Sequence, residues 1–121
     1  ELINRDQKNE ITLTLSLGDQ RPLFRHIQYW TRFLNQDTPV YLGIEKIARK
    51  MNLDVVFLKM RKIRRGVYET EFIPLFENSQ ETKEHEITDK YLSILEKTII
   101  ERPELWLWTH KRWKHLKPDN V

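Results

Sequence analysis

The change of hydrophobic period along the chain is the feature that most constrains its fold. Residues 11–17 alternate apolar and polar side chains, which is the period of a strand. Residues 55–58 form a short run of apolar side chains, as in a strand that is buried on both faces. A strand, a helix and a strand in this order predict a right-handed parallel crossover unit and an α/β fold. The intervening helix is indicated by apolar residues at helical spacing, namely Val40, Ile44, Ile47, Ala48 and Met51.

Turn-forming residues set the expected ends of these elements. Gly18 and Pro22 should end the first strand, because glycine and proline interrupt a ladder. Thr38 is expected to cap the helix, with Pro39 in its first turn, where a missing N–H costs nothing. Asn52 suits a left-handed stop. The helix is therefore expected over residues 38–52.

An antiparallel hairpin is expected to extend the sheet. Beyond residue 58 the second strand becomes basic, and it should turn at Arg65 and Gly66. Residues 67–76 are expected to return as an antiparallel strand, with Pro74 placing part of it at an edge.

A second helix is expected to begin near Thr88, which can cap it. Ile87 and Leu92 are spaced as a hydrophobic staple across its start, and Pro103 should close it. The residues expected on its inner face are Ile87, Tyr91, Ile94, Leu95 and Thr98.

Composition favours one compact domain over residues 1–121. Of these residues 39% are hydrophobic and 11% aromatic, which is enough for a core, and 32% are charged. We expect a lead-in over residues 1–10, a sheet with its crossover helix over 11–76, and a C-terminal helical segment over 87–117. Residues 23–36 are expected to be an ordered loop with a short helix.

Several kinds of catalytic site are excluded by the residues themselves. The chain has no cysteine, which removes disulfides, zinc–thiolate sites and thiol catalysis. Its three glycines are isolated, so no phosphate-cradling loop exists. We expect no metal and no cofactor. We also expect no catalytic base, because none of the four histidines is followed by a carboxylate at the His-x4-Asp/Glu offset; they are His26, His85, His110 and His115.

The sequence does not resemble a complete membrane-anchored protein. It begins at Glu1 without an initiator methionine, and its longest apolar runs, residues 55–58 and 105–108, are too short to span a bilayer. We therefore expect part of a longer protein, with any anchor upstream.

Asp19 and Gln20 are candidates for substrate positioning. They would follow the first strand at its carboxyl end, where open parallel sheets bind ligands. A carboxylate beside an amide can orient substrate oxygens. The alternative is an ordinary loop, because aspartate also satisfies exposed backbone N–H groups.

A basic cluster in the hairpin points to an anionic partner. Guanidinium groups form bidentate contacts with phosphate, and the candidates for such contacts are Arg61, Arg64 and Arg65. The alternative is a solvated hairpin whose charges prevent edge-to-edge aggregation.

The C-terminal region combines tryptophans with basic residues, a composition typical of a membrane interface. The candidates for contact with headgroups are Trp106, Trp108, Lys111, Arg112, Trp113 and Lys114. The alternative is that the rings cover the core and stack on arginine.

Four motifs in this order resemble a known family. They are residues 18–22, the expected helix 38–52, residues 55–61 with the glycine that follows, and the ending 103–114, which is the most specific. Together they cover nearly the whole chain and are similar to the lipid A biosynthesis acyltransferases, the lauroyl and myristoyl transferases of the lysophospholipid acyltransferase superfamily. The chain would form the C-terminal portion, about half, of a single acyltransferase-type domain.

The resemblance implies transfer of a fatty acyl group from acyl carrier protein, or an acyl-CoA thioester, to a hydroxyl of a lipid A precursor. It places the reaction on an anionic membrane surface, the cytoplasmic face of the bacterial inner membrane, without metal or cofactor. Asp19 and Gln20 match the family's Asp-Gln motif near the active site, and Arg61 and Gly66 match its Arg…Gly stretch. The family's His-x4-Asp/Glu base is missing, so this chain is expected to be inactive alone.

Two other functions fit the same residues. A nucleic-acid-binding module would use the basic hairpin, with Tyr68 and Phe72 stacking on bases. A non-catalytic regulatory or scaffolding domain would explain the missing base most simply.

Overall fold

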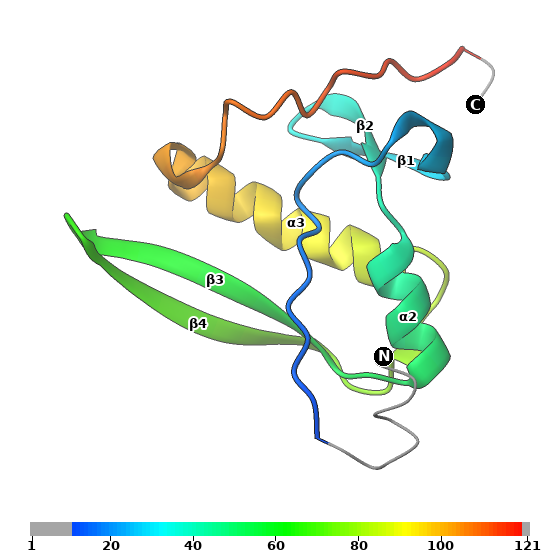
Figure 1. Ribbon diagram of the computed structural model, residues 1–121, viewed down its shortest axis with the longest axis horizontal. Coiled ribbons are helices and arrows are strands. Elements are labelled where there is room, and N and C mark those ends of the chain that lie inside the picture. Colours follow the sequence, from blue (N-terminus) through cyan, green and yellow to red (C-terminus); the bar gives the residue numbers. More distant parts are fainter. Residues whose placement is uncertain (1–10, 120–121) are drawn as a thin grey trace.

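The computed structural model describes residues 11–119 and has a mixed α/β architecture (Figure 1). The expected lead-in, residues 1–10, lies outside the described residues. Two antiparallel hairpins and two α-helices make up the regular structure, together with three short 3-10 helices. The elements in chain order are η1 Phe24–His26, β1 Tyr29–Phe33, β2 Gln36–Val40, α2 Gly43–Met51, β3 Val55–Arg64, β4 Val67–Phe76, η2 Ser79–Glu81, α3 Glu86–Glu101 and η3 Pro103–Leu105.

The expected parallel crossover unit is not present among residues 11–119, and that part of the fold prediction is wrong. Residues 11–17 have no regular secondary structure, although their alternation is that of a strand. A strand forms only where a neighbouring backbone supplies hydrogen-bond partners. The strands on either side of α2, β2 and β3, belong to separate two-stranded sheets. All four apolar side chains of the segment are at least 74% exposed, namely Ile11, Leu13, Leu15 and Leu17.

A β-hairpin replaces the expected loop over residues 23–36 and the expected start of the helix. Thr38 and Pro39 lie in β2, where they pair with Thr31 and Trp30 of β1, so α2 begins only at Gly43. The turn between β1 and β2 uses two residues with positive φ, Leu34 at 49° and Asn35 at 61°. The pairing of β2 with β1 outweighed the local preference of Thr38 for a helix cap. In this strand Thr38 and Pro39 are fully buried.

The end of α2 agrees with the sequence, whereas its apolar face is only partly as expected. Asn52 has φ 50° and ends the helix in the left-handed conformation, as predicted. Ala48 is buried, but Ile47 is exposed.

The β3–β4 hairpin confirms the predicted antiparallel return strand over residues 67–76. Only one face of β3 near its start is covered, so the prediction that residues 55–58 are buried on both faces is wrong. Phe57 is 6% exposed and contacts the ring of Tyr91, whereas Val56 and Leu58 lie on the opposite, exposed face. A two-stranded sheet covered by one helix offers only one face to the core.

Gly66 is the residue whose conformation the hairpin turn requires, since its φ is +76°. A Cβ added there would have open space around it, so replacement by alanine strains only the backbone. We expect Gly66→Ala to lower the free energy of unfolding by about 1 kcal/mol. Urea unfolding measures this, and Gly66→Asn is the matched control, because asparagine tolerates the left-handed region better. Equal losses for both variants would show that the turn does not impose this conformation.

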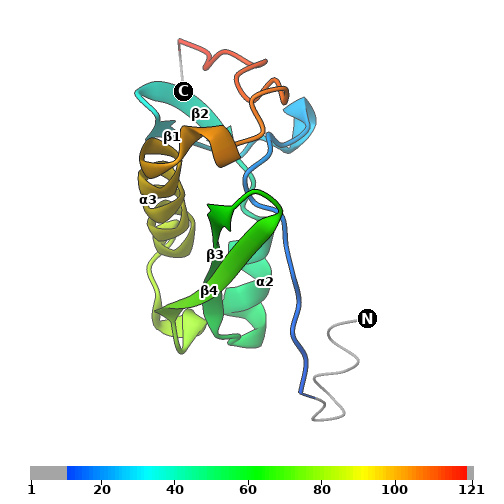
Figure 2. The ribbon, with the colours of Figure 1, turned by 90° about the vertical axis from the view of Figure 1, so that its left-hand side faces the viewer.

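Helix α3 lies between the two hairpins in both views (Figures 1 and 2). The buried core joins its inner face to β1, β2 and the residue before α2, through Phe33, Val40, Leu42, Leu92 and Ile99. Ile87 and Leu92 are both buried at the start of the helix, and Pro103 follows its last turn, as predicted. The chain is helical only to Leu105 within the expected segment 87–117, and the remaining described residues pass over β1 and β2 without regular structure.

The N-terminus of α3 is capped by a residue of α2, which corrects the expectation that Thr88 caps it. The helix begins at Glu86, with no side-chain cap from its own N-cap residue. Glu45 is 4% exposed and accepts hydrogen bonds from the backbone N–H of His85 at 2.6 Å, the backbone N–H of Thr88 at 2.9 Å and the Thr88 hydroxyl at 2.5 Å. A carboxylate at this end also interacts favourably with the helix dipole. Glu45 therefore joins α2 to α3.

Candidate functional site

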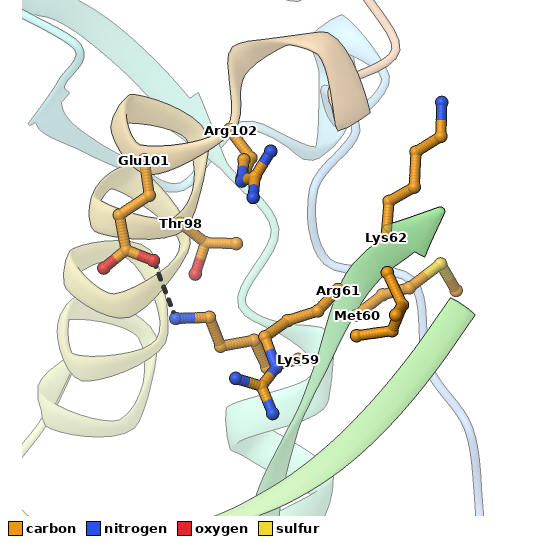
Figure 3. Close-up of a pocket in the computed structure, with 8 residues that line it drawn as sticks. Lys59, Met60, Arg61, Lys62, Thr98, Glu101 and Arg102 are labelled. Atoms are coloured by element: carbon orange, nitrogen blue, oxygen red, sulfur yellow. Dashed lines mark hydrogen bonds and ion pairs between the residues drawn. The ribbon is translucent and has the colours of Figure 1, made fainter. Parts of the chain in front are cut away.

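A cleft between β3 and the C-terminal end of α3 is the clearest candidate site (Figure 3). Its volume is about 190 Å³. Strand β3 forms one wall and the last turn of α3 forms the other, so the cleft depends on how the hairpin packs on the helix. Its lining contains four basic side chains and one acidic one, and consists of Lys59, Met60, Arg61, Lys62, Ile63, Thr98, Glu101 and Arg102.

One ion pair links the two walls of the cleft. Lys59 Nζ lies 2.8 Å from Glu101 Oε2, and Figure 3 shows this pair bridging β3 and α3. The hydrogen bond and charge of Lys59 lower the pKa of the Glu101 carboxyl. Arg61 is paired at 2.5 Å with Glu69 on β4. Such exposed pairs contribute little to stability, so they leave the arginine free to exchange partners.

The remaining cations give the cleft its positive character. Arg102 makes a longer contact of 3.4 Å with Glu104, and the exposed Lys62 has no ion pair within the described part of the chain. Guanidinium and ammonium groups converging on one cleft can bind a phosphate or carboxylate group. Cations therefore outnumber the single acidic residue in the lining of the cleft.

Only one of the three arginines proposed from the sequence lies in this cleft. Arg61 lines it, whereas Arg64 and Arg65 lie at the exposed tip of the hairpin. Arg102 was missed, although it directly follows the C-terminal end of α3, where basic residues are common. The sequence does not show that this end of α3 faces β3. It therefore gives no sign that Arg102 and Arg61 line the same cleft.

Asp19 and Gln20 lie elsewhere, against the C-terminal segment. The backbone N–H of Arg21 donates to His110 Nε2 at 3.2 Å, and Arg21 Nη1 donates to the carbonyl oxygen of Lys111 at 2.8 Å. Gly18 packs so closely that a Cβ there would lie 3.1 Å from the ring of Tyr91. The structure therefore brings the Asp-Gln pair to α3 and the C-terminal segment, and not to the lining of the cleft.

Arg112 is buried in the interior, whereas Asp19 is only half-buried. Arg112 is 1% exposed, and burial lowers its pKa to about 10, although the charge of Asp19 and the phenol of Tyr91 partly oppose this. Burial, together with the charge of Asp19, raises the pKa of Tyr91, so this phenol stays neutral at pH 7. Because it is buried, Arg112 does not contribute to an exposed membrane-facing surface.

The other residues proposed for the membrane interface divide into two groups. Trp106 and Trp113 are half-buried and pack on Phe33, with ring centroids 6.2 and 6.4 Å away. Trp113 Nε1 also donates to the buried Thr38 hydroxyl at 2.8 Å. The exposed members are Trp108, Lys111 and Lys114. A membrane-facing role is a prediction that now applies to these three.

Residues 11–119 lack both a membrane-spanning helix and a metal-binding cluster. This part of the chain has no helix with the length and apolar character needed to cross a bilayer. It also has no group of three or more histidine, aspartate or glutamate side chains placed to share a metal ion.

The mixed α/β fold, the cationic cleft and the Asp-Gln segment occur in a chain whose sequence matches one family model over residues 1–115, nearly its full length. That model describes the bacterial lipid A biosynthesis acyltransferases, and the chain belongs to this family. The activity that defines this family is acyl transfer in lipid A biosynthesis. No curated protein and no solved structure matches the chain.

Proposed function

We propose that the chain provides substrate contacts for an enzyme that transfers a fatty acyl group from acyl carrier protein, or an acyl-CoA thioester, to a hydroxyl of an anionic lipid A precursor. Family membership supports acyl transfer. The observation that carries the substrate assignment is the cleft with its four basic side chains. No general base of the family's type is present in the chain, so the proton of the acceptor hydroxyl is taken by a group outside it.

The cleft would hold an anionic group of the precursor. Arg61 and Arg102 approach it from opposite walls, and each offers a planar set of donors that matches phosphate geometry. Their carboxylate partners, Glu69 and Glu104, lie in exposed pairs that an incoming anion can replace. Arg64 and Arg65 extend the positive charge along the hairpin tip. Asp19 and Gln20 would act on a separate part of the substrate, near the C-terminal segment.

The reaction would take place at the cytoplasmic face of the inner membrane. Exposed basic residues of the hairpin tip would attract an anionic leaflet, and Trp108 with Lys111 and Lys114 would contact its headgroups. Such contacts favour weak and reversible association, since each basic residue contributes roughly 1 kcal/mol.

The chain alone is expected to bind the precursor without acylating it. Loss of a general base costs about 10²–10⁴-fold in rate, and none of the four histidines has a carboxylate at the required offset. The measurement is transfer of labelled acyl chains from acyl carrier protein to a lipid A precursor, with binding followed in parallel. Turnover well above a blank without protein would contradict this expectation. Undiminished precursor binding by Arg61→Glu would contradict the cleft assignment.

A further inference from the structure

The guanidinium of Arg112 lies in an unusual environment for a charged group. Arg112 is among the largest fully buried side chains and is 1% exposed. None of its nitrogens, Nε, Nη1 or Nη2, has a hydrogen-bond partner among the residues that the structure describes. A guanidinium carries five N–H donors, and buried donors of this kind are nearly always paired. Arg112 therefore requires an acceptor.

The acceptor that suits a buried guanidinium is a negatively charged oxygen, because Arg112 is itself charged. Burial lowers the pKa of Arg112 only to about 10, so the guanidinium keeps its proton at pH 7. The half-buried Asp19 lowers the cost of this charge, but it makes no hydrogen bond or ion pair with Arg112. A phosphate or carboxylate group offers two oxygens in the geometry that a guanidinium binds.

Arg112 lies in the C-terminal segment, residues 106–119, which passes over β1 and β2 (Figures 1 and 2). The two residues before it are attached to Arg21. The backbone N–H of Arg21 donates to His110 Nε2 at 3.2 Å, and its Nη1 donates to the carbonyl oxygen of Lys111 at 2.8 Å. The segment has no regular secondary structure, so this junction can open without breaking a helix or a ladder.

A second guanidinium lies at the same junction. Arg21 is half-buried and holds the carbonyl group next to Arg112, and its charge adds to the lowering of the Arg112 pKa. Two like charges repel each other in a region with little water, and an anion bound to both removes this repulsion. The junction is separate from the cleft between β3 and α3, because neither arginine lines that cleft.

We propose that Arg112 and Arg21 form a second anion-binding site, which takes a phosphate or carboxylate group where the C-terminal segment meets residues 18–22. The oxyanion supplies the acceptor that Arg112 does not find in residues 11–119. Because it binds both arginines, it also fastens the C-terminal segment to residues 18–22. The site does not depend on the proposed function of the cleft.

Replacing Arg112 by methionine tests whether the folded chain lacks a partner for this charge. Arg112→Met is expected to raise the melting temperature by about 5 °C, since an apolar side chain of similar volume removes an unpaired buried charge. Lys111→Met changes the exposed neighbouring residue and is the matched control, with an expected change of less than about 2 °C. A lower melting temperature for Arg112→Met would show that the chain itself pairs the charge and would overturn the proposal.

Inorganic phosphate is the probe for the site, and acetate is the probe for a carboxylate ligand. At constant ionic strength, about 50 mM phosphate should raise the melting temperature of the 121-residue chain by about 5 °C or more, as for a dissociation constant near ~1 mM. The rise should persist in Arg61→Glu with Arg102→Glu, which removes two cations of the cleft, and should be absent in Arg112→Met. A larger rise with acetate would assign the site to carboxylate ligands.

The two variants distinguish the second site from the cleft. Equal rises in the parent and in Arg112→Met would overturn the proposal, as would a rise that disappears only in the cleft variant. Failure of the cleft variant to bind the lipid A precursor, with its response to phosphate intact, would support both sites independently.

Discussion

Glu45→Ala is expected to lower the free energy of unfolding by about 3 kcal/mol, or the melting temperature by on the order of 10 °C. The reason is that Glu45 is buried and accepts three hydrogen bonds at the start of α3. Its removal leaves the N–H groups of His85 and Thr88 without their partner and also removes a negative charge from the helix N-terminus. The contact between α2 and α3 would weaken at the same time.

Urea unfolding followed by circular dichroism measures this effect. Glu81→Ala is a matched control, because Glu81 is an exposed glutamate at the end of η2, before α3, and should change stability by less than about 0.5 kcal/mol. Glu45→Gln separates shape from charge: it keeps one acceptor oxygen but places an amide NH₂ group against N–H donors. A Glu45→Ala variant as stable as the Glu81→Ala control would show that α3 is capped in another way.

Reversing two charges of the hairpin tip is expected to weaken binding to anionic vesicles by about 30-fold or more. Arg64→Glu with Arg65→Glu removes two cations, and each contributes roughly 1 kcal/mol near an anionic surface. Rising salt should abolish the binding of the parent chain, since exposed charges are screened beyond about 8–10 Å. Binding that survives salt would indicate insertion of Trp108, because burial of a ring is not screened.

The control is Lys90→Glu with Lys97→Glu, which reverses two exposed lysines of α3 outside the cleft lining. Co-sedimentation with anionic and neutral vesicles, at low and high salt, compares the two double variants. Equal binding to both kinds of vesicle, or equal losses in both variants, would contradict the proposed surface. Salt-dependent RNA binding without vesicle binding would favour the nucleic-acid alternative, with Tyr68 and Phe72 exposed on the same hairpin.

The sequence correctly predicted those structural features that depend on the backbone preference of a single residue. The β3–β4 hairpin could be placed because Gly66 permits the turn conformation and because β-type residues flank it. Asn52 ends α2 for a similar reason, since asparagine tolerates a left-handed conformation at low cost. The family resemblance was equally accessible, because it depends on residue order and not on contacts.

Pairing between strands decided the rest of the fold. Residues 11–17 have the alternation of a strand, but no described neighbour completes a ladder with them, whereas residues 29–40 pair despite Pro39. Thr38 could equally have capped a helix, and the burial of Thr38 beneath Trp113 favoured the strand. Hydrophobic periodicity is a property of one segment, whereas a sheet forms only when two segments pair through backbone hydrogen bonds.

The candidate site shows the same division. The sequence by itself determined that the hairpin is basic, that Asp19 and Gln20 follow a turn-forming glycine, and that no histidine has the spacing of the family's base. Only the tertiary structure placed Arg102 across the cleft from Arg61, and only it buried Arg112. Arg61 and Arg102 are far apart in the chain and meet only when the hairpin packs on α3, and the desolvation of Arg112 arises only when the core closes over it.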